Sequence, residues 1–526
     1  MQRFNSFLLL TRRQIFQIRN GGLRGFFLKV YARNSSNDQF RSSKLSKFAC
    51  FLSKLLLNLS THSNKKELVR LNSLVPKLIS DIPVKQNHAI RDAIKFGKEL
   101  RKSELFREER KLYEELCKVY PSNIEPLSSL ASTKYLDGDI IGWKKDYQSI
   151  LKISDAESNR RFGADHNLRV LGVEWTGPMG HLAQVDAIIK LNQLGMLSPE
   201  KRIIVTNTSQ IANSTLLKLW GERIDVFQLS NQEYSRIAEK HWPIFEHVPC
   251  IKFVDGNRDQ TTAWSTANFL WEKAGNPPLI SVSESLETRA RKVLRRWGLK
   301  DDSWFVGLHV REGEHSLRRQ LPNADINTYL PAIRRVIELG GFVIRMGNPL
   351  MAPLPKIHGL IDYAHSVERV DWMDVFLWGK SRFFIGTNSG GSDVPQVFGV
   401  PVIKSNFSHI GQSFYSPKSF MVPKLFKHKD SGQLLTLSEM FESPFAWTVS
   451  LFHEGFKIEA INNDPGDLVD AVNEMEISLR VQDINLGVQD VSELVARSDA
   501  IRRRHGALGE LPIGNSFLSK YHELIR

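Results

Sequence analysis

Two motifs in the second half of the 526-residue chain combine residue types that could bind a diphosphate. The first is the apolar run 304–308 followed by His309-Val-Arg311, which predicts a strand that carries a histidine and an arginine on one face. The second is the turn 387–392, Thr-Asn-Ser-Gly-Gly-Ser, which follows the apolar run 383–386. Its glycines let a backbone come close to a ligand, and its hydroxyls and the helix start predicted after it suit a phosphate.

A further arginine should lie near these motifs. The segment 340–347 predicts a strand and turn with Arg345 at its end. Because ligands bind at the carboxyl ends of strands in open parallel sheets, we expect Arg311, Arg345 and the turn to face one crevice. They could balance the charge of a leaving nucleoside diphosphate without a metal ion or other cofactor. Ordinary turn chemistry explains each feature alone, but less readily all of them at successive strand ends.

The loop after Arg311 is rich in ionisable side chains that could move a proton. An inverting transfer of a group to a hydroxyl needs a general base within hydrogen-bonding reach. Glu312, Glu314 and His315 are the candidates on this loop, beside Arg311, and His181 could face them from the preceding segment. Each of these side chains alone could equally be a solvated charge or, for His181, a helix-start residue.

The segment 167–300 carries another glycine-containing turn. Residues 168–174 predict a buried strand, the turn holds Gly177, Gly180 and His181, and a helical apolar pattern follows. We expect these three residues on the acceptor side of the site, although such turns are common between strands and helices. The apolar run 202–206 predicts the next strand, and alternating strands and helices indicate a doubly wound parallel sheet.

Residues 67–166 have a helical, polar-faced pattern with one internal repeat. The run 111–118 (K-x-Y-x-x-L-x-K) matches 145–152 (K-x-Y-x-x-I-x-K) at an offset of 34 residues, the period of tetratricopeptide helix pairs. The segment resembles one and a half such repeats, which could bind a protein partner or cap the neighbouring domain. Asp137-x-Asp139 has the spacing of a metal site, but aspartate and glycine are expected in a helix–helix turn.

The positive charge of the chain is concentrated in residues 1–66. They hold 13 Lys and Arg and one acid, which is +12 of the formal charge of +14. Their apolar clusters are too short to span a bilayer and lack the features of a secretory signal. The arm could lie on anionic lipid, form a flexible tail, or, more weakly, bind nucleic acid. The three scattered cysteines indicate a reducing compartment rather than a disulfide framework.

Six motifs of the chain closely resemble a bacterial family assigned as GT-B glycosyltransferases and often associated with surface-polysaccharide genes. They are 307–312 (GLHVRE), 323–333 (NADINTYLPAI), 340–347 (GGFVIRMG), 361–366 (IDYAHS), 371–377 (DWMDVFL) and 383–390 (FFIGTNSG). The resemblance is strong over about 300–455 and looser over 167–300. It implies a GT-B fold and transfer of a sugar from a nucleotide sugar.

More distantly, His309-Val-Arg311 and the turn resemble the donor site of GT-B fucosyltransferases. That resemblance implies that Arg311 serves the leaving diphosphate, that Ser389 and its neighbours contact the phosphates, and that Asp362 reads the base or ribose. One fucosyltransferase group continues with a second arginine and an aspartate, where this chain has Glu312-Gly313-Glu314. Fucose is therefore not implied. The expected donor-binding residues are His309, Arg311, Arg345, Asp362, Thr387, Asn388, Ser389, Gly390, Gly391 and Ser392.

The expected fold is α/β of GT-B type, with two Rossmann-like doubly wound domains that face a cleft, preceded by the tetratricopeptide-like segment. The expected divisions are a basic arm (1–66), the helical segment (67–166), an acceptor domain (167–300), a nucleotide-sugar domain (301–455) and closing helices (456–526).

The expected function is metal-independent sugar transfer from a nucleoside-diphosphate sugar to a glycan or lipid-linked acceptor in surface-polysaccharide synthesis. It would take place in the cytoplasm, with the arm on the inner face of the membrane and the helical segment open to a protein partner; nucleic acid is not an expected partner. The alternative is a non-catalytic GT-B-like module that binds a nucleotide or glycan and acts through its helical segment and arm.

Overall fold

The computed structural model describes residues 86–102, 105–163, 167–312, 321–448, 457–480, 491–507, 509 and 511–526. The basic arm and two of the candidate bases, Glu314 and His315, lie outside these ranges. The chain divides into two compact units, residues 1–153 and 154–526, which are described separately. Among the described residues, no helix combines the length and the apolar character needed to cross a membrane.

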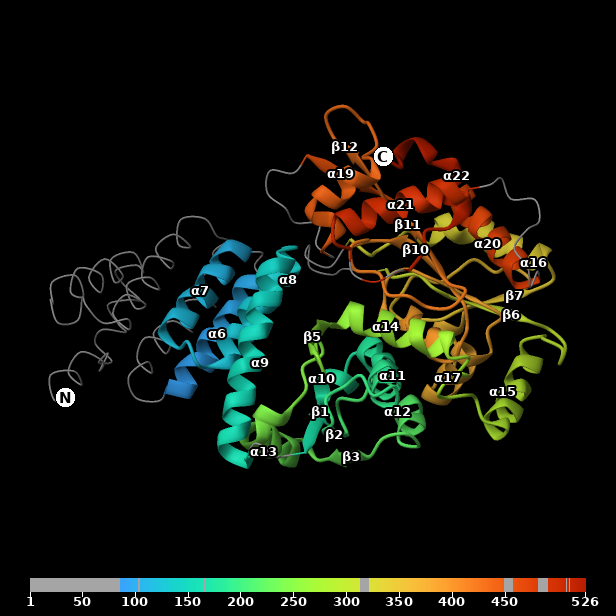
Figure 1. Ribbon diagram of the computed structural model, residues 1–526. Coiled ribbons are helices and arrows are strands. Elements are labelled where there is room, and N and C mark those ends of the chain that lie inside the picture. Colours follow the sequence, from blue (N-terminus) through green and yellow to red (C-terminus); the bar gives the residue numbers. More distant parts are fainter. Residues whose placement is uncertain are drawn as a thin grey trace, which may run out of the picture. The chain divides into compact units, whose positions relative to one another are not determined.

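The first unit is helical where it is described, as the sequence predicts (Figure 1). The matched runs of the repeat fall in two of its helices, where Tyr113 and Tyr147 are buried at equivalent positions. The turn aspartates Asp137 and Asp139 lie 3.6 and 3.0 Å from the guanidinium of Arg110. The relation to tetratricopeptide proteins stays a prediction. The helices are α6 (Gln86–Lys102), α7 (Phe106–Val119), α8 (Ile124–Leu136) and α9 (Ile140–Phe162).

The second unit contains a six-stranded sheet whose strands all run parallel. The order in the sheet is β11-β10-β9-β6-β7-β8, so the chain winds outward from β6 in one direction and then from β9 in the other. This is the doubly wound arrangement predicted for residues 301–455, with its reversal between β6 and β9. The strands are β6 (Phe305–His309), β7 (Phe342–Arg345), β8 (Leu360–Ile361), β9 (Phe384–Gly386), β10 (Val402–Phe407) and β11 (Phe420–Pro423).

Helices cover this sheet and close the chain. Helix α20 packs on α16 and on β10 and β11, and α22 packs on α20. The predicted closing segment is therefore helical, but it also contains a strand, β13 (Ile458–Ile461), which pairs with β12 (Leu425–His428). The helices are α16 (Leu330–Glu338), α17 (Asp371–Lys380), α18 (Val394–Val397), α19 (Leu437–Glu442), α20 (Pro465–Arg480), α21 (Ser492–Arg504) and α22 (Asn515–Lys520).

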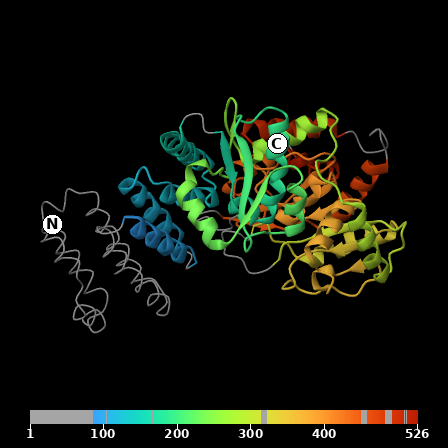
Figure 2. The same cartoon turned by 90° about the horizontal axis from the view of Figure 1, so that it is seen from below.

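The segment 167–300 differs from the prediction of a second doubly wound sheet. Its three parallel strands lie in the order β1-β2-β3 and add in one direction only. On the free side of β1 the chain makes a single bridge, between Val170 and Phe245, and then turns into an antiparallel hairpin. These elements form the cyan and green part of Figures 1 and 2. The strands are β1 (Leu168–Leu171), β2 (Lys201–Asn207), β3 (Val226–Leu229), β4 (Cys250–Phe253) and β5 (Gly256–Asp259).

Six helices accompany these strands. Helix α15 is followed by Gly298 at a φ of +89°, a conformation that glycine adopts without strain. The helices are α10 (Val173–Thr176), α11 (Met179–Gln193), α12 (Ser214–Trp220), α13 (Asn231–His241), α14 (Gln260–Lys273) and α15 (Glu284–Arg296).

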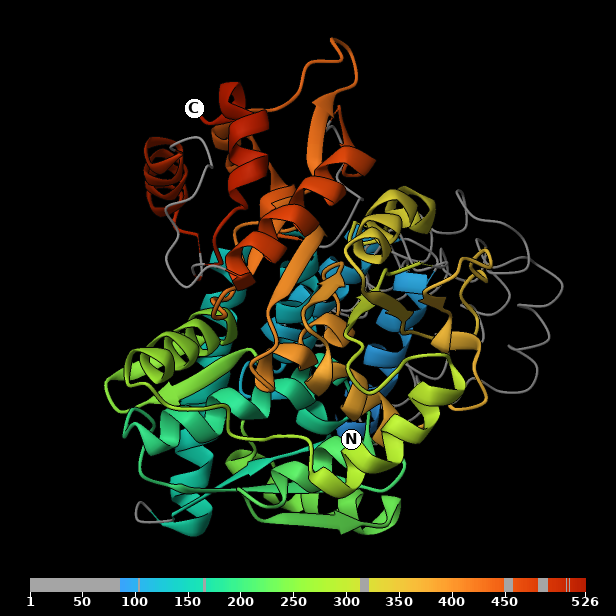
Figure 3. The same ribbon diagram turned by 90° about the vertical axis from the view of Figure 1, so that its right-hand side faces the viewer.

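The two α/β segments contribute side chains to one hydrophobic core. A single cluster of buried side chains includes Leu182 and Trp220 from the first segment and Phe376 from the second. The carboxylate of Asp371, at the start of α17, accepts a hydrogen bond of 2.7 Å from the backbone N–H of Ser214, at the start of α12. Figure 3 shows the green segment directly against the yellow and orange one. The predicted arrangement of two domains facing a cleft is therefore not confirmed.

Candidate functional site

The two diphosphate-binding motifs meet at the point where the strand order of the large sheet reverses. Strands β6 and β9 are neighbours, with His309 opposite Gly386. The hydroxyl of Ser389 lies 2.9 Å from Nδ1 of His309, and the backbone N–H of Arg311 donates to Oγ1 of Thr387 at 2.9 Å. In open α/β sheets, the crevice beside such a reversal is where ligands bind. The structure thus brings the two motifs together.

The turn 387–392 has an inner and an outer part. Thr387 and Ser392 are fully buried, and the hydroxyl of Ser392 donates to the Thr387 carbonyl at 2.5 Å. The residues between them, 388–391, are half-buried. The Ser392 hydroxyl therefore holds the turn in shape, whereas the side chains of Asn388 and Ser389 contact His409 and His309. All six residues were expected to bind the donor, and that role stays a prediction.

A buried lysine hydrogen bonds to the end of the turn 387–392, and it was not predicted from the sequence. Lys404 on β10 is 1% exposed, and its ammonium donates to the Ser392 carbonyl at 2.9 Å and to the carboxylate of Asp393. Burial lowers the pKa of Lys404, and the adjacent Asp393 opposes that shift. A lysine directly after the apolar run 401–403 was the available signal, because a lysine within a buried strand is rarely without a partner.

His309 contributes a hydrogen bond rather than a charge. Burial, with the nearby charges of Arg345 and Arg311, lowers the pKa of His309 to about 4. The imidazole is therefore neutral near pH 7, and its ring lies against Gly391 and the Ser389 hydroxyl. Arg311, two residues further along the chain, is half-buried, and its contact with a diphosphate stays a prediction.

Arg345 lies at the same sheet edge, as predicted, but in internal ion pairs. Its side chain is 1% exposed, 3.2 Å from Asp362 and 3.6 Å from Glu312, and it donates to the Ala352 carbonyl. The other carboxylate oxygen of Asp362 accepts from the backbone N–H of Leu354 at 3.0 Å. Arg345 therefore ties together the loops that follow β6, β7 and β8. Direct contact of Arg345 or Asp362 with a ligand stays a prediction.

Glu312 is the candidate base on the β6 loop that the structure describes, and its carboxylate lies 3.6 Å from Arg345. Its side chain is 16% exposed. Burial raises the pKa of Glu312, Arg345 opposes the shift, and the negative charges of Asp325 and Asp362 add to it. A carboxylate with a raised pKa accepts a proton more readily than an ordinary glutamate, which suits a general base.

The predicted acceptor-side turn lies directly against the turn 387–392. A side chain on Gly390 would place its Cβ 2.4 Å from the backbone nitrogen of Gly180, so the two backbones touch. Gly177 follows α10 in a helical conformation, and Nδ1 of His181 lies 2.8 Å from the Glu174 carbonyl. Gly180 thus serves the contact between the two segments. A role of these three residues in binding an acceptor stays a prediction.

Replacing Gly390 with alanine is expected to lower the free energy of unfolding by about 1–3 kcal/mol, because the new methyl group meets backbone that cannot move aside. Gly391→Ala is the matched control, since its Cβ would lie 3.5 Å from the His309 ring, an ordinary contact. Urea unfolding of both variants checks this. Equal stability of the two variants would show that the contact with Gly180 does not hold the turn.

No protein family and no curated protein matches the sequence. Among solved structures, a family 9 glycosyl transferase from Veillonella parvula DSM 2008 is 12% identical, with 49% of this chain and 86% of that one aligned and a TM-score of 0.32. The iron-containing dodecameric glycosyltransferase TibC from enterotoxigenic E. coli H10407 is 12% identical, with coverages of 60% and 77% and a TM-score of 0.33. An O-GlcNAc transferase mutant from Thermobaculum terrenum is 10% identical, with coverages of 91% and 98% and a TM-score of 0.22.

These neighbours are glycosyltransferases by name, but their similarity to the chain is too low to assign an activity. A proposal for the function of the chain therefore depends on the strand order and on the geometry at the ends of β6 and β9.

Proposed function

We propose that the chain is a glycosyltransferase that takes a sugar from a nucleoside-diphosphate donor. One observation carries the proposal: His309, Arg311 and the turn 387–392 converge where the strand order of a doubly wound parallel sheet reverses. A diphosphate needs hydrogen-bond donors and positive charge. This site offers backbone N–H groups near two glycines, a hydroxyl and a guanidinium.

In the proposed reaction the bond between the sugar and the β-phosphate breaks, and negative charge builds on the leaving diphosphate. Arg311 and the outer part of the turn stabilise that charge, as preorganised donors do in other active sites. Glu312 removes the proton from the acceptor hydroxyl as its oxygen bonds to the anomeric carbon. We propose that no metal ion is needed, because the guanidinium takes over charge neutralisation. The acceptor is a glycan or lipid-linked saccharide, in keeping with the resemblance to proteins of surface-polysaccharide synthesis.

A panel of sugar nucleotides tests the proposal. GDP-, UDP- and ADP-sugars carry a diphosphate, whereas a CMP-sugar carries one phosphate and serves as a matched control. We expect one of the diphosphate sugars to raise the unfolding temperature and the CMP-sugar to leave it unchanged, because ligand binding to the folded state stabilises it. Equal responses to all four nucleotides, or none, would contradict a diphosphate site.

Release of free nucleoside diphosphate separates an enzyme from the non-catalytic alternative. A transferase is expected to release the nucleotide in the presence of acceptor, and more slowly to water. A module that only binds would give the thermal shift without release.

A further inference from the structure

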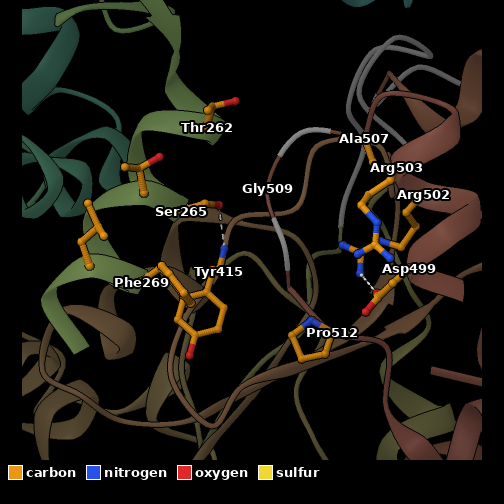
Figure 4. A pocket seen from close by; sticks show the side chains of 12 residues that line it. Thr262, Ser265, Phe269, Tyr415, Asp499, Arg502, Arg503, Ala507, Gly509 and Pro512 are labelled. Carbon is orange, nitrogen blue, oxygen red and sulfur yellow. Dashed lines mark hydrogen bonds and ion pairs between the residues drawn. The ribbon is translucent and has the colours of Figure 1, made fainter. Parts of the chain in front are cut away.

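A pocket of about 690 Å³ lies away from the turn 387–392, between helices α14 and α21. This volume is within the range typical of small-molecule sites. Figure 4 shows Thr262, Ser265 and Phe269 on the α14 side and Arg502 and Arg503 on the opposite wall. Its lining comes from segments far apart in the sequence, and none of its residues was expected to be functional.

One wall of the pocket presents an aromatic surface beside hydroxyl groups. Phe269 is 45% exposed, and its ring centroid lies 5.9 Å from that of Tyr415 at an angle of 77°. Thr262, Ser265 and Thr266 line the same helix face. A saccharide offers an apolar C–H face to an aromatic ring and hydroxyls to polar neighbours, so this combination fits a sugar.

The opposite wall is basic. Arg502 is 5% exposed, and its guanidinium donates to the Ser413 hydroxyl at 3.0 Å and to Asp499 at 3.3 Å. The neighbouring Arg503 is exposed and lines the pocket. Because Asp499 is engaged by Arg502, the charge that a ligand meets on this wall is positive.

A short segment connects the pocket to the turn 387–392. The amide of Asn388 lies 3.0 Å from the His409 ring, and Tyr415, six residues further, lines the pocket. Between them, the Phe414 ring stacks on the ring of Trp264 of α14, with 4.2 Å between the ring centroids. The Lys404 ammonium lies 5.5 Å from the centroid of the Phe414 ring. The lysine that supports the turn thus also contacts Phe414, the chain neighbour of the pocket residue Tyr415.

We propose that this pocket binds a saccharide that carries an anionic group, a carboxylate or a phosphate, and that this saccharide is part of the acceptor. The assignment as acceptor rests on the proposed function; the binding of an anionic saccharide does not. The hydroxyls of Thr262 and Ser265 already hydrogen bond to Asp259 and to the backbone N–H of Tyr415. Phe269 therefore supplies the stacking surface, Thr266 binds a sugar hydroxyl, and Arg503 binds the anionic group.

Saturation-transfer NMR on the full chain tests this with three probes: a glucuronate-containing chondroitin disaccharide, glucose 6-phosphate and neutral N,N′-diacetylchitobiose (chitobiose below). We expect the anionic probes to bind more tightly than chitobiose, and the stronger of the two identifies the anionic group. Arg503→Gln should weaken the anionic probes about tenfold, the loss of one charge-assisted hydrogen bond, and leave chitobiose unchanged. Phe269→Ala should weaken all three by about fivefold.

Arg504→Gln is the control, because Arg504 is an exposed neighbour on the same helix that does not line the pocket. The inference fails if Arg503→Gln and Phe269→Ala bind the probes as the parent does, or if the parent binds none of them. The thermal shift with diphosphate sugars, measured on the same variants, should stay unchanged. Probe binding without any such shift in the parent would overturn the proposed donor site while leaving the saccharide pocket intact.

Discussion

Replacing Arg311 with alanine is expected to lower kcat/KM for the diphosphate-sugar donor about 1,000-fold while the protein stays folded. Arg311 follows the carboxyl end of β6, and its backbone N–H contacts Thr387 in the turn 387–392, where the proposed reaction builds charge on the leaving group. Its neighbour His309 is neutral, so that histidine cannot replace the lost charge. The contact that joins the two motifs uses the backbone N–H of Arg311, which alanine keeps.

Nucleotide release measured over a range of donor concentrations checks this prediction, with urea unfolding as the test of folding. Arg311→Lys should recover part of the rate, because it restores the charge but not the planar fork of donors. Arg335→Ala is the control for loss of an arginine, since Arg335 lies on α16 and donates to Asn473 at 2.7 Å. Parent-like turnover by a folded Arg311→Ala protein would remove the donor-site assignment.

The sequence was sufficient to predict which residues stand at strand ends. Apolar runs followed by His309-Val-Arg311 and by the turn 387–392 predict strand ends, and both strands exist close to the expected bounds. Which strands are neighbours could not be read from the chain, because the order in a sheet depends on long-range packing. The pairing of β6 with β9, which makes these two motifs one site, needed the structure.

Arg345 shows why a residue type and a strand end are not enough to predict a role. A phosphate-binding arginine and a structural one have the same local sequence, and only the nearby carboxylates distinguish them. Glu312 and Asp362 are 33 residues before and 17 residues after Arg345, on other loops of the same sheet edge. Since no local pattern relates them, the ion pairs were not predictable.

The shared core of the two α/β segments was unpredictable for a similar reason. Amphipathic helices predict that a face is buried, but not which sheet buries it. Leu182 and Trp220 could have packed within their own segment, yet they lie in one cluster with Phe376. The pocket between α14 and α21 depends on the same long-range packing, so its residues carried no signal in the sequence.

Replacing Glu312 with glutamine is expected to lower kcat about 100- to 1,000-fold with little change in donor binding, because the glutamine cannot accept the acceptor proton. Arg345 would keep its ion pair with Asp362, so we expect the loops at the sheet edge to remain in place. Steady-state kinetics with donor and acceptor varied separately checks the prediction. If kcat is unchanged, the base is another group, such as His181 or one of the candidates on the following loop.

The pH dependence distinguishes a base from a residue that only positions others. Glu312 must be ionised to act, so activity should fall as the pH decreases through its pKa, and burial moves that fall to a higher pH than for an ordinary glutamate. Asp325 contributes to this shift through its negative charge, and it caps a turn by accepting from the backbone N–H of Asn327, which asparagine can also do. Asp325→Asn should therefore move the fall in activity to lower pH without loss of the cap. A different group titrates if the fall in activity at low pH stays at the same pH in Asp325→Asn. The same conclusion holds if that fall persists in Glu312→Gln.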